Sequence, residues 1–192
     1  MSQAVKITLT AEERRFLIDL VPWSIKNGLE GRGRPPAGAI PPPPEGILRE
    51  PMGAFVTLHK NGKLRGCIGM MQPITPLYQT VAAMAHAAAF EDGRFKPLAS
   101  GELPDIKFDI SILGPVSLCP DIKQIELGRH GVILKARGRS SVFLPQVPVE
   151  QGWSLTDTLE QLCRKAGLPP ESWQDSTAAV HWYESLLIVP EE

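Results

Sequence analysis

Residues 54–68 read AFVTLHKNGKLRGCI and carry the strongest β-hairpin signal in the sequence. Two runs rich in apolar and β-branched residues, 54–58 and 64–68, flank the dipeptide Asn61-Gly62. That dipeptide fits a type I′ turn, because both of its positions tolerate a positive φ angle. The stretch therefore predicts a β-hairpin whose second strand carries Leu64-Arg65-Gly66-Cys67-Ile68-Gly69, called the LRGCIG segment below.

Hydrophobic periodicity predicts further elements on both sides of this hairpin. Strands are expected at residues 106–112, with one buried face, and at 178–189, and a second hairpin at 131–135 and 141–144 around Gly138-Arg139. Helices are expected at 11–27, behind a Thr10–Glu13 capping box, at 76–90, with Thr75 as N-cap, and from 155 to Gly167. Hairpins mixed with helices, without β-α-β alternation, indicate an α+β domain with a largely antiparallel sheet flanked by helices.

Residues 31–46 form a Pro-rich segment with six Pro and four Gly. Such a composition disfavours both a helix and a central strand, so an exposed, partly extended connection without core residues is expected. We expect this segment to be dispensable for folding. An alternative interpretation of its four consecutive prolines is a ligand for SH3-type domains.

The overall composition is that of an ordinary globular protein. Twenty Lys and Arg balance twenty-one Asp and Glu, giving a net charge of -1. This balance makes nucleic acid an unfavourable partner and gives no attraction to a membrane surface. The chain has no run of the roughly 18 apolar residues that a membrane span needs and no apolar signal at its start. Three cysteines without paired spacing indicate reduced thiols and a cytoplasmic protein.

Cys67 is the first candidate for a catalytic residue. It lies on the second hairpin strand between Gly66 and Ile68, where a glycine lets a ligand or another backbone come close. Arg65 is two residues away, hence on the same face of a regular strand, and its charge would favour the reactive thiolate by lowering the pKa of the thiol. The alternative is that Cys67 is a small buried hydrophobe beside glycines needed for packing.

His130 is the second candidate, because it lies between Arg129 and Gly131 at the entrance of a predicted strand. Such a histidine could act as the acid/base partner of Cys67 if the two were close in space. It could equally be a structural loop residue. His59, His86 and His181 are interpreted as structural.

Several common sites are not encoded by recognisable motifs. There is no Cys-x-x-Cys, no His-x-x-x-His and no cluster of carboxylates, so no metal is expected. The glycines do not form a phosphate-binding loop, and no cofactor is expected. The serine hydrolase motif Gly-x-Ser-x-Gly is also missing.

The LRGCIG segment resembles the signature hexapeptide of the AMMECR-one family, called AmmeMemoRadiSam system protein A in prokaryotes. The similarity covers about residues 10–189. It continues through Asp92-Gly93-Arg94-Phe95, where the family usually has Pro or Ser at the second position, through Leu144-Pro145-Gln146-Val147, and through the segment from Leu162 to Leu168. The resemblance identifies residues 1–192 as a single AMMECR-one domain.

The resemblance implies a two-part α+β fold in which a smaller subdomain forms a cleft around the LRGCIG segment. Leu64, Gly66, Ile68, Gly69, Arg94 and Gln146 would then contact a small-molecule or peptide ligand. It also implies Memo-like and radical SAM proteins as partners, but no established reaction. Two hypotheses follow: a cysteine-dependent enzyme that uses Cys67, His130 and Arg65, and a non-catalytic module that docks a partner protein.

Overall fold

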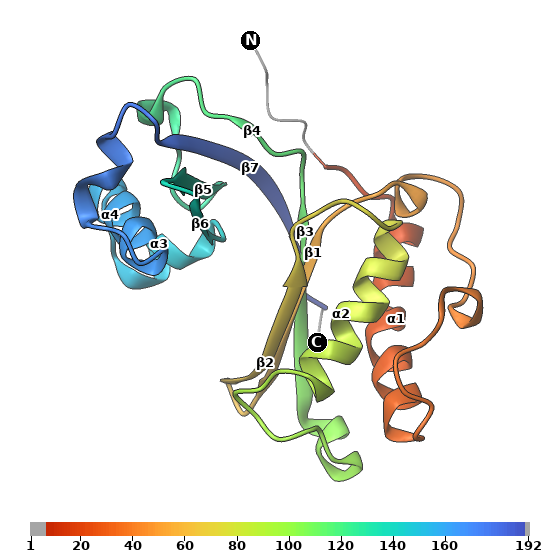
Figure 1. The fold of residues 1–192 in the computed structure, drawn as a ribbon. Helices are drawn as coiled ribbons and strands as arrows, with labels where there is room; N and C mark the ends of the chain where they lie inside the picture. Colours follow the sequence, from red (N-terminus) through yellow and green to blue (C-terminus); the bar gives the residue numbers. More distant parts are fainter. Residues whose placement is uncertain (1–6, 191–192) are drawn as a thin grey trace. The chain divides into compact units, whose positions relative to one another are not determined.

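The computed structural model describes residues 7–190 and divides into two compact units. The N-terminal unit comprises residues 8–113 and the segment that starts at Leu186, and the smaller C-terminal unit comprises residues 114–185 with Ile7. Each unit combines antiparallel strands with helices (Figure 1). The predicted α+β class with a largely antiparallel sheet is therefore confirmed.

The hairpin that the sequence predicts is the centre of the N-terminal unit. Strands β1 (Ala54–Lys60) and β2 (Lys63–Met70) pair antiparallel, and Asn61 and Gly62 have φ angles of 52° and 72°. Both angles are positive, as a type I′ turn requires. Strand β3 (Ile106–Leu113) pairs antiparallel with the other side of β1. The LRGCIG segment consequently lies on β2, the edge strand of this sheet.

Two helices, α1 (Ala11–Leu29) and α2 (Leu77–Phe90), cover one face of this sheet (Figure 1). The predicted capping box of Thr10 and Glu13 starts α1. The N-cap of α2 is Pro76 and not Thr75, because the chain is still extended at Pro76, whose carbonyl oxygen accepts from the amides of the first turn. Small side chains let the two helices approach closely, and the Ser24 hydroxyl donates to the Ala82 carbonyl oxygen at 2.7 Å.

The Pro-rich segment is mostly exposed, but the expectation that it holds no core residue is wrong. Ile40 and Pro43 are buried, and residues 37–39 form a single 3-10 turn, η1 (Ala37–Ala39). The segment leads into η2 (Ile47–Arg49), whose Ile47 amide donates to the buried Glu13 carboxylate at 3.0 Å. The carboxylate that caps α1 therefore also holds the end of this segment in place.

The C-terminal unit is built on the antiparallel strands β4 (Ser117–Leu118), β7 (Ala179–Ile188), β5 (His130–Ala136) and β6 (Arg139–Phe143). Residues 186–188 of β7 belong to the N-terminal unit. Helix α4 (Leu155–Lys165) packs on β5 and β6, with η4 (Ile122–Gln124) and η5 (Pro170–Gln174) beside the same core. The remaining 3-10 turn, η3 (Ser100–Asp105), belongs to the N-terminal unit.

The C-terminal unit differs from the sequence prediction at the β5–β6 turn and in the helix that follows β6. The β5–β6 turn is formed by Arg137 and Gly138, with φ angles of 49° and 73°, one residue earlier than expected. A short helix, α3 (Gln146–Gln151), lies where the sequence analysis expects no element, and it contains Pro148. The proline is tolerated since it lies in the first turn, where a backbone N–H has no partner within the helix.

Candidate functional site

The LRGCIG segment contains a β-bulge at Arg65. Leu58 pairs with Gly66 while His59 pairs with Leu64, so Arg65 is an extra residue between two pairs. A bulge of this kind interrupts the alternation of side chains along a strand. As a result Gly66 lies on the face that packs against α2, and Cys67 lies on the opposite face with Thr57, its partner on β1.

The backbone of Cys67 is held by two side chains from the loop after α2. The Asp92 carboxylate accepts from the Cys67 N–H at 2.9 Å, and the Arg94 guanidinium donates to the Cys67 carbonyl oxygen at 3.2 Å. Arg94 also binds Asp92 through two of its nitrogens, at 2.7 and 2.9 Å. The pair thus satisfies the outward N–H and C=O of an edge strand, groups that another strand would otherwise pair with.

Asp92 and Arg94, the two side chains that hold the Cys67 backbone, both keep their charges at neutral pH. Asp92 is buried, with 4% of its side chain exposed, whereas Arg94 is 57% exposed. The hydrogen bonds from Arg94 hold the pKa of Asp92 far below its ordinary range, and the Cys67 amide acts in the same direction. Asp92 is therefore an anion throughout the neutral range, and Arg94 remains its cation.

Arg65 is bound to Glu102 and not to Cys67. Its Nε and Nη2 donate to the two oxygens of Glu102 at 3.1 and 2.9 Å, and Nη2 also donates to the Lys96 carbonyl oxygen. These bonds from Arg65 are the main reason why the pKa of Glu102 is lowered to about 2, and the Ala99 amide and Lys60 act in the same direction. The remaining nitrogen, Nη1, is buried and has no hydrogen-bond partner in the described part of the chain. The guanidinium is thus committed to a carboxylate.

The pKa of the Cys67 thiol is raised, opposite to the sequence prediction. Burial is the main cause, and the carboxylates of Asp109 and Asp92 act in the same direction. The Thr57 hydroxyl, 3.6 Å from the sulfur, and the Arg94 charge oppose this shift without reversing it. The prediction that Arg65 lowers this pKa is wrong, because the cation that acts on the thiol is Arg94, while Arg65 is bound to Glu102.

The two glycines of the LRGCIG segment have packing roles. A Cβ at Gly66 would collide with the Ala88 carbonyl oxygen on α2, and a Cβ at Gly69 would collide with the ring of Phe55, its partner on β1. Of the other expected ligand contacts, Leu64 is 43% exposed and Ile68 is partly buried. Gln146 begins α3 in the C-terminal unit. Whether these residues bind a ligand stays a prediction.

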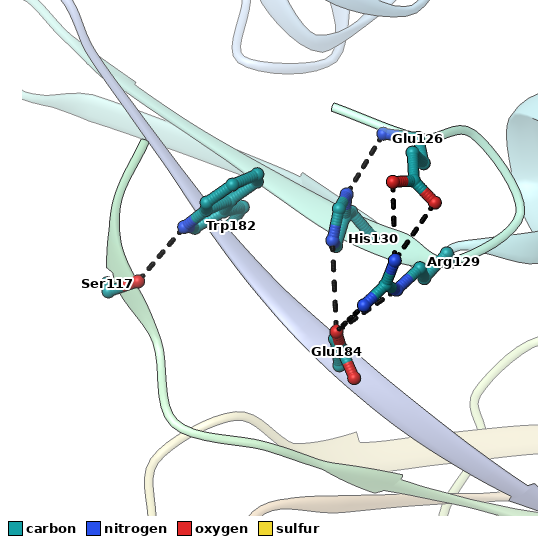
Figure 2. A network of polar contacts seen from close by, with 6 residues as sticks. All are labelled: Ser117, Glu126, Arg129, His130, Trp182 and Glu184. Carbon is teal, nitrogen blue, oxygen red and sulfur yellow. Dashed lines mark hydrogen bonds and ion pairs between the residues drawn. The ribbon is translucent and has the colours of Figure 1, made fainter. Parts of the chain in front are cut away.

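His130 lies in the C-terminal unit, in the polar network that Figure 2 shows. Its Nδ1 accepts from the Glu126 N–H at 2.9 Å, and its ring packs 4.6 Å from that of Trp182. Arg129 bridges the carboxylates of Glu126 and Glu184 beside it. Burial and the Arg129 charge lower the pKa of His130, so the imidazole is neutral at neutral pH. Its role as acid/base partner of Cys67 stays a prediction, since the two residues lie in different units.

Sequence reasoning missed another polar pair of the N-terminal unit. His59 Nε2 lies 2.8 Å from the Asp109 carboxylate, on the same sheet face as Thr57 and Cys67. Alternation along β1 and β3 could have placed these side chains together, had the pairing of the two strands been known. Within residues 7–190, no three His, Cys, Asp or Glu side chains are arranged to hold a metal ion. No helix of that range could span a membrane.

Comparison with known proteins matches residues 20–188 to the model of the AMMECR1 family. Protein MK0488 of Methanopyrus kandleri is 39% identical, covering 96% of this chain and 91% of the relative. Protein MJ0810 of Methanocaldococcus jannaschii is 36% identical, with 92% and 90% covered. The crystal structure of the uncharacterised protein PH0010 from Pyrococcus horikoshii superposes with a TM-score of 0.80 at 33% identity, covering 93% of this chain and 92% of that one. The chain therefore belongs to the AMMECR1 family, the AMMECR-one family that its LRGCIG segment resembles.

Proposed function

We propose that this protein is a binding module that docks a partner protein at strand β2, and that Cys67 is not a nucleophile at neutral pH. The observation that carries this proposal is the bidentate bond between Arg65 and Glu102. An activated cysteine needs a cation or a base that favours its thiolate. Arg65, the basic residue nearest to Cys67 in the sequence, is bound to Glu102. Burial moreover raises the pKa of the Cys67 thiol.

The LRGCIG segment then acts as a rigid edge strand. Asp92 and Arg94 hold its backbone at Cys67, while Gly66 lets α2 pack directly underneath. A rigid surface loses little conformational entropy when it binds, which favours protein recognition. Leu64 projects from this strand with 43% of its surface exposed and offers an apolar contact. The Memo-like and radical SAM proteins implied by the family resemblance are the partners that we propose.

Leu64→Glu is expected to weaken binding to such a partner at least tenfold, because the substitution buries a charge in an apolar contact. The measurement is biolayer interferometry with purified Memo-like and radical SAM proteins. Ile74→Glu is the matched control, since Ile74 is 66% exposed and lies in the loop after β2. If neither protein binds the parent, or if both variants bind like the parent, docking at β2 is refuted.

A cysteine-dependent enzyme is the second candidate, and the Thr57 hydroxyl beside the Cys67 sulfur favours it. Such a donor stabilises a thiolate once the thiolate forms. The substrate would be a small molecule or a modified peptide, with Cys67 as nucleophile. This candidate and the docking module differ in the reactivity of the thiol.

Under the docking proposal, Cys67 is expected to react with iodoacetamide at pH 7 several-fold more slowly than glutathione does. The physical reason is its raised pKa, which leaves a smaller thiolate fraction. The measurement uses a Cys119→Ser background, which removes the other partly exposed thiol. The third thiol, that of Cys163, is buried. Cys67→Ser identifies the label, and Arg65→Gln should leave the rate unchanged. Rapid stoichiometric labelling at pH 6 would instead support the enzyme.

A further inference from the structure

A cavity of about 410 Å³ lies at the β5–β6 turn, and all its walls come from the C-terminal unit. Residues 135–140 form most of the lining, and Thr177 and Ala179, from the chain that enters β7, complete it. No Asp or Glu of residues 7–190 lines this cavity, whereas three basic residues do. The lining therefore favours an anion, and it shares no residue with the LRGCIG segment.

The strand register places an ammonium group and a hydroxyl group side by side at this cavity. Lys135 pairs with Ser140 on β6 and with Ala179 on β7. Directly paired residues of neighbouring strands lie on the same face of the sheet, with Cβ atoms about 5 Å apart. Because both neighbours of Lys135 are small, its side chain is left exposed between them.

The charge of Lys135 is not neutralised by the protein. Its ammonium group forms no hydrogen bond or ion pair with any of residues 7–190. The charge acts instead on His181, two residues after Ala179 on β7. Burial lowers the pKa of His181, and the positive charge of Lys135 acts in the same direction. An uncompensated cation beside a hydroxyl group is what an anionic ligand requires.

The two arginines of the lining are held by other groups. Arg137 binds the Oδ2 atom of Asp175 through Nε and Nη2, at 3.0 and 2.9 Å. Arg139 pairs with Ala136, hence on the face opposite to Lys135, and its Nη1 donates to two carbonyl oxygens at the end of α4. Both charges add to the positive potential at the β5–β6 turn, but Lys135 is the cation whose partner can be a ligand.

We propose that this cavity binds the phosphate group of a small phosphate monoester, with Lys135 as the cation and the hydroxyl groups of Ser140 and Thr177 as further donors. A monoester phosphate carries nearly two negative charges at neutral pH and offers three acceptor oxygens. Lysine binds phosphate as a point charge, so its preference follows the charge of the ligand. The volume of the cavity lies within the range of small-molecule sites, about 300–1,000 Å³.

The test compares three ligands at pH 8 and constant ionic strength. Methyl phosphate is a dianion, dimethyl phosphate is a monoanionic diester like those of nucleic acids, and acetate is a monoanion without phosphorus. Each is titrated into isotope-labelled protein while the NMR signals of the Gly138 and Ala179 amides are followed. Methyl phosphate is expected to bind about fivefold more tightly than either monoanion, as the second charge near an exposed ammonium would give. Equal affinities for the monoester and the diester, or no shift of these two signals, would overturn the proposal.

Lys135→Gln removes the charge at the cavity and should abolish the preference for methyl phosphate. Lys123→Gln is the matched control, because Lys123 is another exposed lysine of the C-terminal unit and does not line the cavity. This control removes the same unit of net charge and should keep the preference. Lys135→Arg, which retains the charge, should bind methyl phosphate more tightly than Lys135→Gln. Equal losses in Lys135→Gln and Lys123→Gln would show that the net charge of the protein, and not the cavity, attracts the ligand.

Ser140→Ala tests the contribution of the hydroxyl group. It leaves the charge of Lys135 in place and should weaken the binding of methyl phosphate severalfold, because one hydrogen bond to a charged ligand is lost. An unchanged affinity would contradict the contact with Ser140. The titrations need neither a partner protein nor the Cys67 thiol. Failure of docking at β2 would therefore leave them unaffected, and the two proposals fail separately.

Discussion

Replacing Gly66 by alanine is expected to lower the free energy of unfolding by roughly 3 kcal/mol, near the upper end for overpacking. The added Cβ meets the Ala88 carbonyl oxygen. Because this atom belongs to the backbone of α2, no rotation of a side chain can relieve the collision. Either α2 moves away from β2 or the strand bends, and both changes disturb the core. Urea unfolding followed by circular dichroism measures the effect.

Gly93→Ala is the matched control for this prediction. A Cβ at Gly93 meets no atom within 4 Å, and the backbone there does not have a positive φ angle. This substitution should change the free energy of unfolding by less than about 1 kcal/mol, since it mainly restricts the unfolded chain. Two variants of equal stability would remove the steric reason for a glycine in the LRGCIG segment.

Removing the carboxylate of Asp92 is the second change with a large expected effect. Asp92→Ala should lower the free energy of unfolding by about 3 kcal/mol, because the Cys67 N–H and the Arg94 guanidinium both lose their acceptor. The effect stays below the upper end for a buried ion pair, since water can solvate the exposed Arg94. Asp19→Ala is the control, because its pair with Arg15 is exposed and spans 3.9 Å. That control should cost less than about 0.5 kcal/mol.

The loss caused by Asp92→Ala should also depend on pH. The pKa of Asp92 is lower in the folded protein than in the unfolded chain, so its contribution is fully present above the unfolded value of about 3.9. It declines as the pH falls below that value, at up to about 1.4 kcal/mol per pH unit. The difference between parent and variant should therefore shrink by about 1 kcal/mol between pH 5 and pH 3. A difference that grows toward acid pH would refute an ionised Asp92.

The parts of the fold that sequence predicts well are those determined by local chemistry. The Asn61-Gly62 turn, the Thr10–Glu13 capping box and the helix closed by Gly167 each depend on a few neighbouring residues. Such signals depend on residues a few positions apart in the sequence, so these elements can be predicted without knowledge of the tertiary structure. The burial of Ile40 and Pro43 in the Pro-rich segment depends on distant packing, and composition alone gave the wrong answer.

The candidate site was harder to predict because its partners are distant in the sequence. Glu102 binds Arg65 across 37 residues, and Asp92 binds the Cys67 amide across 25. A spacing of two residues suggested that Arg65 acts on Cys67. The bulge and the Glu102 carboxylate decide otherwise, and neither is visible in the local pattern. The electrostatics of a cysteine depends on what folding brings to it.

Because Arg65 is an extra residue in β2, the positions that tolerate substitution are expected to follow one alternation before Arg65 and the opposite alternation after it. Before it, Leu64 shares a face with His59, while after it Gly66 shares a face with Leu58. Positions 64 and 66 thus face opposite sides although they are two apart, and the alternation of tolerant and intolerant positions changes phase at Arg65. A sequence profile that assumes a regular strand would therefore assign Cys67 to the helix-packed side, and only a profile with a phase change places it correctly.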